Sequence, residues 1–311
     1  MKALLTTGTG PYGIALGDRP DPVPGATEVL VAVEAVGVNR GELARIAVSP
    51  AGAPLGWDVY GHVVRPADDG SGPPAGTPVV GLSGGEGWAE LAVLATDRLA
   101  AVPEVLGSTA AALPVAGLTA RYALRAAGPP TGRTVAITGA GGGVGRIAVQ
   151  LAAVAGARTI ALVGDPSQHQ DLAHAGADVV AAYGADTGPV DVLLDSVGGE
   201  ALTAAFDRVR PGGVVVAFGN SSRAPLQLPP TWARDRPGVT LRGLGLFDEI
   251  TRQHTARDLE GLVIRAAAGR LDPNVVVTTG WEDAPAVLQG LNERRIAGKA
   301  VLLTGSHGAG A

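Results

Sequence analysis

The chain has 311 residues, which is enough for two domains or for one large one. Hydrophobic residues make up 46% and charged residues 17%, so we expect a substantial core, and a net charge of −5 without a basic block argues against nucleic acid as a partner. The absence of cysteine excludes disulfides, thiolate zinc sites and cysteine nucleophiles. The apolar patch near the N-terminus is too short for a signal peptide or a membrane span, so we expect a cytoplasmic protein that binds no membrane.

Residues 1–100 have the pattern of a β-rich domain. Short apolar runs predict strands, and Gly/Pro clusters predict the turns between them. The strands are expected at 1–7, 28–36, 78–82 and 87–94. Regular short strands of this kind are typical of a small barrel or sandwich.

A different pattern begins at residue 133, where apolar strands alternate with helices. This order predicts a doubly wound parallel sheet. We expect its strands at 134–138, 158–163, 178–182, 191–196, 213–219 and 239–247, and helices at 169–175, 198–209 and 251–268.

The run from Arg133 to Gly156 carries the clearest functional signal. A short strand is followed by a glycine-dense turn and then by an Ala/Val/Leu-rich helix. Small side chains let a pyrophosphate approach the backbone, and a helix N-terminus offers free N–H groups and a positive dipole end. The alternative is an ordinary glycine-rich turn, because the strict GxGxxG spacing is absent. We predict a dinucleotide-phosphate site formed by Ala140, Gly142, Gly143, Val144 and Gly145.

Several motifs together resemble the medium-chain dehydrogenase/reductase superfamily, in its zinc-free quinone oxidoreductase branch. They lie at residues 28–39, 56–64, 115–119, 139–145, 175–178, 195–199, 210–213 and 298–302. The resemblance covers nearly the whole chain and implies an α/β fold in which a Rossmann doubly wound parallel sheet is inserted in a GroES-like β-rich catalytic domain. The Rossmann cofactor-binding domain would span 118–248, and the catalytic domain 1–117 and 249–311. A bound nicotinamide cofactor and hydride transfer are also implied.

The zinc alcohol dehydrogenases of this superfamily differ from the chain at their metal ligands. Where the resemblance places those ligands, the chain has Asn39, Trp57 and Val115. A catalytic zinc needs about three protein ligands and an open position. We therefore expect no zinc, and hydride addition to a quinone or an enone, whose π-system spreads the charge that it accepts.

Two residues are candidates for catalysis. In zinc-free relatives an asparagine at the position of Asn39 contacts cofactor and substrate, although an asparagine after a strand can equally cap a turn. Relatives often have a tyrosine a few residues later, where this chain has Ala44. Tyr60 is the candidate that replaces this tyrosine as proton donor, and its alternative is a packed aromatic ring with its hydroxyl in water.

Further cofactor contacts follow from the resemblance. Thr119 matches a threonine that meets the nicotinamide in relatives, with a helix-interior threonine bonded to its own backbone as the alternative. The ends of the fifth and sixth strands are expected beside the nicotinamide half, and plain packing competes with that interpretation for the two leucines there. These strand-end residues are Gly219, Asn220, Ser221, Leu244 and Leu246.

The end of the second strand decides between NADPH and NADH. Asp165 lies about 20 residues after Gly145, the spacing of an acid that bonds the ribose of NAD, whereas its position before Pro166 favours a helix N-cap. In the resemblance, Gly164 stands where NAD-specific members have the acid, and Tyr183 matches a tyrosine beside the 2′-phosphate of NADPH. We expect NADPH, with NAD(H) as the less favoured alternative.

These observations support an NADPH-dependent reductase of quinones or α,β-unsaturated carbonyls. The alternatives are an enoyl reductase of a polyketide or fatty-acid type pathway and a non-catalytic NADPH-binding protein. The apolar fifth and sixth strands lie at one edge of the predicted sheet, and such an edge promotes aggregation unless it is paired. Relatives pair this edge across a two-fold axis, so we expect a homodimer through it.

Overall fold

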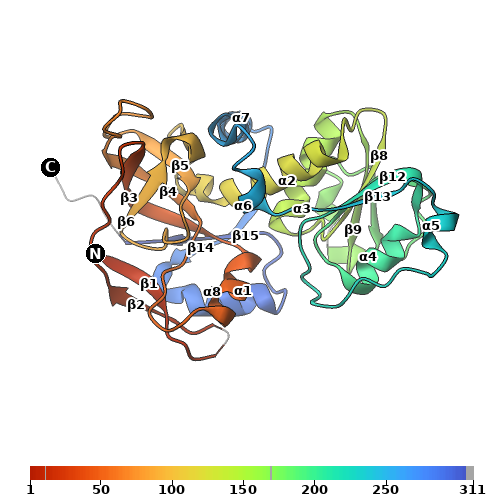
Figure 1. Ribbon diagram of the computed structural model, residues 1–311, viewed down its shortest axis with the longest axis horizontal. Coiled ribbons are helices and arrows are strands. Elements are labelled where there is room, and N and C mark those ends of the chain that lie inside the picture. The colour runs from red at the N-terminus through yellow and green to blue at the C-terminus, as the bar shows by residue number, and fades with distance from the viewer. Residues whose placement is uncertain (11, 169, 306–311) are drawn as a thin grey trace. The chain divides into compact units, whose positions relative to one another are not determined.

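The computed structural model describes residues 1–10, 12–168 and 170–305 (Figure 1). Contacts between Cα atoms divide the chain into two compact units. The first, the β-rich unit, comprises Met1–Ala116 and His254–Ala311, and the second, the parallel-sheet unit, comprises Gly117–Gln253. Helix α2 (Pro114–Ala127) starts in the first unit and continues in the second.

The β-rich unit is built on a seven-stranded sheet whose path runs β14-β15-β3-β4-β5-β7, with β6 paired to β3. The C-terminal segment returns to this sheet, because β15 pairs antiparallel with β3. The strands are β3 (Glu28–Val38), β4 (Asp58–Arg65), β5 (Pro78–Leu82), β6 (Leu91–Ala95), β7 (Leu99–Ala101), β14 (Val275–Gly280) and β15 (Lys299–Leu303). A separate antiparallel pair is formed by β1 (Lys2–Thr6) and β2 (Ile14–Asp18).

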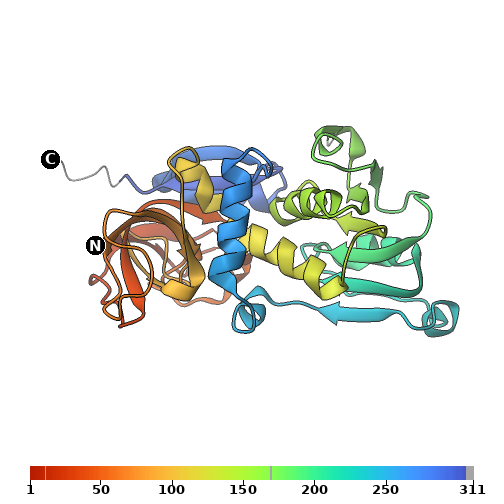
Figure 2. The same ribbon diagram turned by 90° about the horizontal axis from the view of Figure 1, so that it is seen from above.

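Besides the start of α2, the described residues of the β-rich unit form the α-helices α1 (Arg40–Val48), α7 (Thr255–Ala267) and α8 (Ala284–Asn292). Helix α1 packs against α8, and α7 packs against β7. Figure 2 shows α7, in blue, as one straight helix. A short 3₁₀ helix, η2 (Gly107–Ala112), packs against β3, β4 and β15 just before α2 begins.

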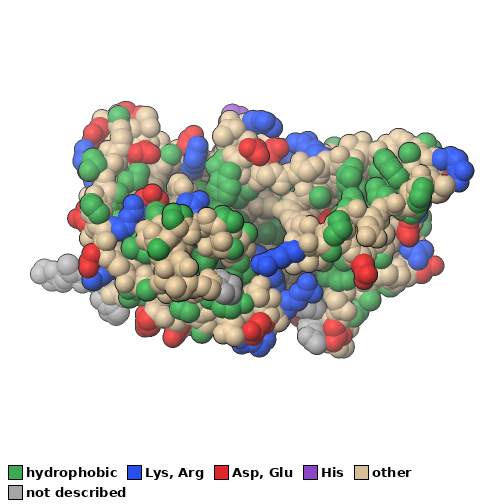
Figure 3. Space-filling view, turned by 60° about the horizontal axis from the view of Figure 1, so that its bottom comes forward, with side chains coloured by type: hydrophobic (Ala, Val, Ile, Leu, Met, Phe, Trp, Pro, Cys, Tyr) green, Lys and Arg blue, Asp and Glu red, His purple; other side chains and the backbone are tan. Residues whose placement is uncertain are grey.

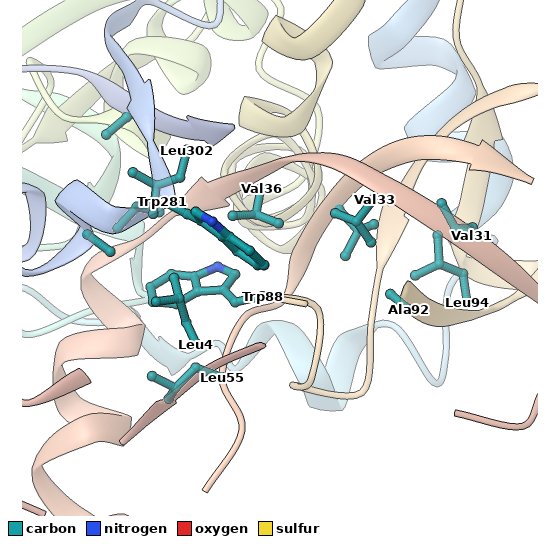
Figure 4. Packing of buried hydrophobic residues seen from close by; sticks show 14 of the residues in the cluster. Leu4, Val31, Val33, Val36, Leu55, Trp88, Ala92, Leu94, Trp281 and Leu302 are labelled. Atoms are coloured by element: carbon teal, nitrogen blue, oxygen red, sulfur yellow. The ribbon is translucent and has the colours of Figure 1, made fainter. Parts of the chain in front are cut away.

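The core of the β-rich unit is filled by alternate residues of its strands. Val31, Val33 and Val36 of β3 are fully buried in one cluster with Trp88 and other apolar side chains. Figure 4 shows this cluster, in which Trp281 and Leu302 come from the C-terminal segment. Residues far apart in the sequence therefore share one core, which predicts that they unfold together.

The parallel-sheet unit has six strands in the order β10-β9-β8-β11-β12-β13, all paired in parallel. Numbered from β8, this is the order 3-2-1-4-5-6 of a Rossmann sheet. The chain adds strands first on one side of β8 and then on the other, and right-handed crossovers on the two sides place helices on both faces of the sheet. The strands are β8 (Thr134–Thr138), β9 (Arg158–Val163), β10 (Val179–Ala182), β11 (Val190–Asp195), β12 (Val209–Ala217) and β13 (Thr240–Gly243). The helices after α2 are α3 (Gly143–Val154), α4 (Gly199–Phe206), α5 (Trp232–Asp235) and α6 (Leu246–Glu249).

The predicted fold class is confirmed, and two predicted elements are wrong. Described residues of the expected helix 169–175 form only a 3₁₀ turn, η4 (Gln170–Leu172), and residue 169 lies outside the described residues. The sixth strand, expected over 239–247, ends at Gly243, and Leu246 begins α6. Glycines at 243 and 245 interrupt the apolar run, and the second serves as the N-terminal cap of α6.

Gly61 provides a test of the packing between β3 and β4. A Cβ atom at this position would lie 1.9 Å from the carbonyl oxygen of Ala32 and 2.9 Å from Cα of Val33, both backbone atoms. We expect Gly61→Ala to lower the free energy of unfolding by about 3 kcal/mol or more, because neither atom can rotate away. Gly243→Ala is the matched control in an edge strand, since no atom lies within 4 Å of its Cβ position. Urea unfolding followed by tryptophan fluorescence measures both, and equal stability of the two variants would contradict the close approach.

Candidate functional site

The glycine loop joins β8 to α3 at the carboxyl end of the parallel sheet. Gly142 is the N-cap of α3 and makes no side-chain cap hydrogen bond, so the first-turn N–H groups of Gly143, Val144 and Gly145 are not taken up by a capping side chain. A Cβ atom on Gly145 would lie 2.3 Å from the carbonyl oxygen of Gly139. The loop therefore folds back on the helix more closely than any side chain allows, which leaves its backbone N–H groups as the binding surface.

A buried carboxylate on the neighbouring strand holds the start of this loop. Asp195, at the end of β11, is fully buried and accepts hydrogen bonds from Thr138 Oγ1 at 2.5 Å and from the N–H of Gly198 at 3.0 Å. Ser196 Oγ donates to the carbonyl of Thr138 at 3.2 Å. Burial raises the pKa of Asp195, and the hydrogen bonds from Thr138, Gly198 and Val197 partly offset that rise. The sequence indicates this stretch only as a family motif, because the contact between Asp195 and Thr138 joins residues 57 positions apart.

The ends of β12 and β13 lie on the same side of the sheet as the glycine loop, because all six strands run in parallel. The N–H of Ser221 donates to the carbonyl of Ser196 at 3.1 Å, which joins the end of β12 to the end of β11. Asn220 Nδ2 donates to the carbonyl of Ala224 at 3.0 Å. Gly219 precedes these residues and packs against Ser196. Gly219, Asn220 and Ser221 thus lie at the same end of the sheet as the glycine loop. Their contacts to a cofactor remain predictions.

The two predicted leucines lie at the end of β13. The N–H of Leu244 donates to the carbonyl of Ala217 at 2.8 Å, while Leu246 opens α6, and both side chains are buried. Thr119 lies in α2 and is also buried. Tyr183 follows β10 and packs against the core of the parallel-sheet unit. The contacts that we predict from these four residues to a cofactor remain predictions.

The end of β9 carries no acidic side chain at the predicted position. Gly164 is exposed, and no atom lies within 4 Å of its Cβ position. Asp165 Oδ1 accepts hydrogen bonds from the N–H and the hydroxyl of Ser167 at 2.9 and 2.6 Å, which closes a turn at the 3₁₀ helix η3 (Pro166–Gln168). The side chain of Asp165 thus caps the start of this 3₁₀ helix, in agreement with the N-cap interpretation of its position before Pro166.

Polar groups of the β-rich unit gather where β3 ends and α1 begins. Asn39 exposes 9% of its surface, and its amide has charged partners at both ends. Oδ1 accepts a hydrogen bond from Lys299 Nζ at 2.6 Å, and Nδ2 donates to Asp58 at 2.9 Å. A second carboxyl oxygen, Oε1 of Glu42, lies at a longer 3.5 Å from Nδ2. The contact that we predict from Asn39 to cofactor and substrate would use this more weakly held hydrogen.

Glu42, Asp58 and Lys299 form the buried charged cluster around Asn39. Glu42 and Asp58 are fully buried, and Lys299 exposes 3%. Glu42 accepts the N–H of Asn39 at 2.8 Å, and Asp58 accepts the N–H of Val115 at 2.8 Å. Burial, and next the charge of Asp58, raise the pKa of Glu42 to about 8, against the opposite effects of Lys299 and Asn39. Sequence reasoning missed Glu42 and Lys299, because their partners are close only in the folded chain.

Tyr60 lies two residues beyond Asp58 on β4, on the same face of the strand. It exposes 6% of its surface, and its ring contacts that of His62 edge-on. Burial, followed by the charges of Glu34 and Glu104, raises the pKa of Tyr60, so its hydroxyl keeps its proton. Its proposed role as proton donor remains a prediction.

The donor set of this region does not fit a zinc ion. Asn39, Trp57 and Val115 stand at the expected ligand positions, and the ring of Trp57 packs against Gly41 of α1. Over residues 1–10, 12–168 and 170–305 there is no group of three or more His, Asp or Glu that could hold a metal ion. An amide, an indole and an aliphatic side chain offer none of the nitrogen, sulfur or carboxylate ligands that zinc takes.

Surface charge and helix length add two further findings. Figure 3 shows acidic and basic side chains interspersed with apolar ones on the face that it draws. Within the part of the chain that the structure describes, no helix has the length and apolar character needed to cross a membrane.

Comparison with known proteins gives a consistent family. A family model described as zinc-binding dehydrogenase matches residues 143–259. The chain is 35% identical over 301 residues to erythronolide synthase EryA2 of Saccharopolyspora erythraea, a match that covers 89% of this chain and 8% of that protein. The chain spans 3% to 8% of the length of the curated relatives that it matches.

Two solved mycobacterial structures have the same fold over nearly their whole length. A quinone oxidoreductase is 28% identical, with a TM-score of 0.84, over 97% of this chain and 99% of that one. The protein Rv1454c, complexed with NADPH, is 27% identical, with a TM-score of 0.88, over 97% of this chain and 100% of that one. As the sequence motifs predicted, the chain belongs to the medium-chain dehydrogenase/reductase superfamily, in its quinone oxidoreductase-like branch.

Proposed function

We propose that the chain is an NADPH-dependent reductase that transfers hydride to a quinone or to an α,β-unsaturated carbonyl without zinc. The observation that supports this most directly is the N-terminus of α3, which has no side-chain cap and lies behind a glycine loop held by Asp195. Such a terminus presents backbone N–H groups and a positive dipole end to a pyrophosphate. Membership of an oxidoreductase family supports catalysis by the chain.

The residues at the carboxyl end of the parallel sheet fit a phosphorylated dinucleotide. Gly142, Gly143, Val144 and Gly145, with Ala140 before them, would hold the pyrophosphate through backbone N–H groups. Gly164 leaves open space at the end of β9, where a carboxylate would repel a 2′-phosphate. The NADPH complex of a mycobacterial relative supports the same cofactor here. When bound, this cofactor supplies the hydride.

Other residues would orient the cofactor. We propose that Tyr183 lies beside its 2′-phosphate and that Thr119, Gly219, Asn220, Ser221, Leu244 and Leu246 contact its nicotinamide half. Their backbone groups and hydroxyls supply the hydrogen-bond donors and acceptors that a carboxamide needs.

Hydride transfer leaves negative charge on the acceptor oxygen, and the β-rich unit supplies candidate donors to it. Asn39 Nδ2 would donate a hydrogen bond to the oxygen, and Tyr60 would deliver the proton. The raised pKa of Tyr60 suits a group that must arrive protonated at neutral pH. The zinc positions contain no fitting ligand set, so no step is assigned to a metal.

A second candidate function is enoyl reduction in a polyketide or fatty-acid type pathway. A match to a protein named as part of the spectinabilin polyketide synthase system supports it, beside the 35% identity to erythronolide synthase over 301 residues. Both reactions add hydride to a conjugated acceptor, so the same donors would serve.

We also propose that the chain forms a homodimer through the edge of the parallel sheet. The edge strand β13 has four residues, all exposed, and the exposed side chains of Leu241 and Phe247 lie on it and just after it. An apolar edge of this kind is protected when a second strand pairs with it.

Turnover separates the candidate functions. We expect NADPH oxidation, followed by absorbance, with 9,10-phenanthrenequinone and with a 2-enal, because both spread the accepted charge. Faster turnover of an enoyl thioester than of either would favour the enoyl reductase. Tight NADPH binding with no turnover of any of the three would identify a binding protein instead.

Cofactor preference can be tested at Gly164. We expect Gly164→Asp to raise the Kd for NADPH at least about tenfold, or about 1.4 kcal/mol, through repulsion of the 2′-phosphate, with little change for NADH. Gly164→Asn is the control of the same size without charge. Isothermal titration measures the affinities of the wild type and both variants for NADPH and NADH, and equal weakening of NADPH binding by both variants would show that size rather than charge decides.

The role of Tyr60 can be tested by removing one atom. We expect Tyr60→Phe to lower kcat about 100-fold with the KM for NADPH unchanged, because general acids contribute about this much. The thermal unfolding midpoint serves as the control for folding. A variant that folds and keeps the wild-type kcat would remove Tyr60 from the mechanism.

A further inference from the structure

The buried cluster of the β-rich unit contains more carboxyl groups than cations. Glu42 and Asp58 are fully buried, and Lys299, with 3% exposure, is the one cation of the described chain among the groups that act on Glu42. If both carboxyls were ionised, the cluster would carry a net charge of −1 away from water. Burial of an uncompensated charge is unfavourable enough that such groups take up a proton instead.

The hydrogen bonds indicate which of the two carboxyls is less well stabilised in its ionised form. Lys299 Nζ donates to Val38 O at 3.1 Å, Asn39 Oδ1 at 2.6 Å and Asp58 Oδ2 at 3.3 Å, which uses all three hydrogens of an ammonium. Asp58 accepts from Lys299, from Asn39 and from the N–H of Val115, as a carboxylate does. Glu42 accepts one short bond, from the N–H of Asn39, and one of 3.5 Å. Glu42 is therefore the carboxyl whose charge is least supported.

The same bonds decide the orientation of the Asn39 amide. Its oxygen faces the ammonium and its nitrogen faces the two carboxyls. A flipped amide would point its N–H groups at Lys299 and its oxygen at Asp58, so charge selects one orientation. Ionisation of Glu42 would add repulsion from Asp58 at the first turn of α1, where Asn39 is the N-cap.

We propose that Lys299 and Glu42 are positioning residues that act on the reduction through Asn39, and that the site works in the form in which Glu42 holds a proton. This inference rests on the proposed function, because it assigns Asn39 to the acceptor. Lys299 orients the amide, and the protonated Glu42 leaves the second Nδ2 hydrogen available to the acceptor oxygen.

The charged surroundings of Glu42 are few. Asp58 on β4 and Lys299 on β15 are the charged groups that act on it. Helix α8, which packs against α1, has no charged residue over Ala284–Asn292. On α1 itself, the side chain of Arg40 is exposed at the surface, and the guanidinium of Arg45 is directed to Gly85. The pKa of Glu42, raised to about 8 by burial and Asp58, therefore places the loss of its proton just above neutral pH.

The variant E42Q tests this inference, since glutamine has the shape of the protonated acid and cannot ionise. We expect kcat/KM of the wild type to fall about tenfold per pH unit above pH about 8, and the E42Q profile to stay level relative to its own value at pH 7. K299M should lower kcat at least about tenfold with the KM for NADPH little changed, and K299R should recover part of the loss. An alkaline fall in E42Q equal to that of the wild type overturns the proposal.

Thermal unfolding gives a readout that does not depend on activity. The folded pKa of Glu42 lies above the ordinary value of 4.5, so its contribution to stability is complete below pH about 4.5 and is lost as the pH rises to about 8. The unfolding midpoint of E42Q should therefore rise relative to the wild type between pH 5 and 8. A constant difference overturns the assignment of the proton to Glu42.

E249Q is the matched control, because Glu249 is also a buried carboxyl. Burial would raise its pKa, but hydrogen bonds from Gln253 and Arg242 outweigh burial and lower it. The difference in unfolding midpoint between E249Q and the wild type should stay constant from pH 6 to 9. A wild-type protein that reduces no acceptor overturns the proposed function and with it the positioning role, while the unfolding difference still decides separately whether Glu42 holds a proton.

Discussion

The ammonium group of Lys299 is the constraint on which the polar interior of the β-rich unit depends. It lies on β15 and donates to the end of β3, to the N-cap of α1 and to Asp58 on β4. Asp58 in turn accepts the N–H of Val115 in the first turn of α2. An isolated buried cation is strongly unfavourable, so these elements must stay together once Lys299 is inside. The charge thus determines which strand ends and helix starts meet.

In the parallel-sheet unit a single buried carboxylate has a comparable role. Asp195 is fully buried at the end of β11 and binds the last residue of β8 and the N–H of Gly198 before α4. In both units a buried acid ties a strand end to a helix start. These hydrogen bonds constrain the glycine loop and the start of α1, the two places where we propose that a ligand binds, and constraint before binding reduces the entropy lost on binding.

The sequence predicts the regular parts of this architecture well, because their signals are local. The β-branched run before Gly139 and the small residues after it sufficed to predict β8, the glycine loop and α3. The helix expected at 169–175 is wrong, because its described residues form only the 3₁₀ turn η4, which follows the 3₁₀ turn that Asp165 caps. The cluster around Asn39 could not be predicted from the sequence, because Lys299 and Asn39 are 260 residues apart and no periodicity links them.

The role that we propose for the cluster in the reduction differs from that of a catalytic metal ion. A zinc ion polarises a carbonyl because it keeps an open coordination position. The ammonium of Lys299 has none, since its three hydrogens are held by Val38, Asn39 and Asp58. Its hydrogens are therefore not available to an acceptor, and the group that it orients is the Asn39 amide. In the proposed function, the polar group that would meet the acceptor is the neutral amide of Asn39, and such a donor is sufficient where a conjugated acceptor already spreads the charge it receives.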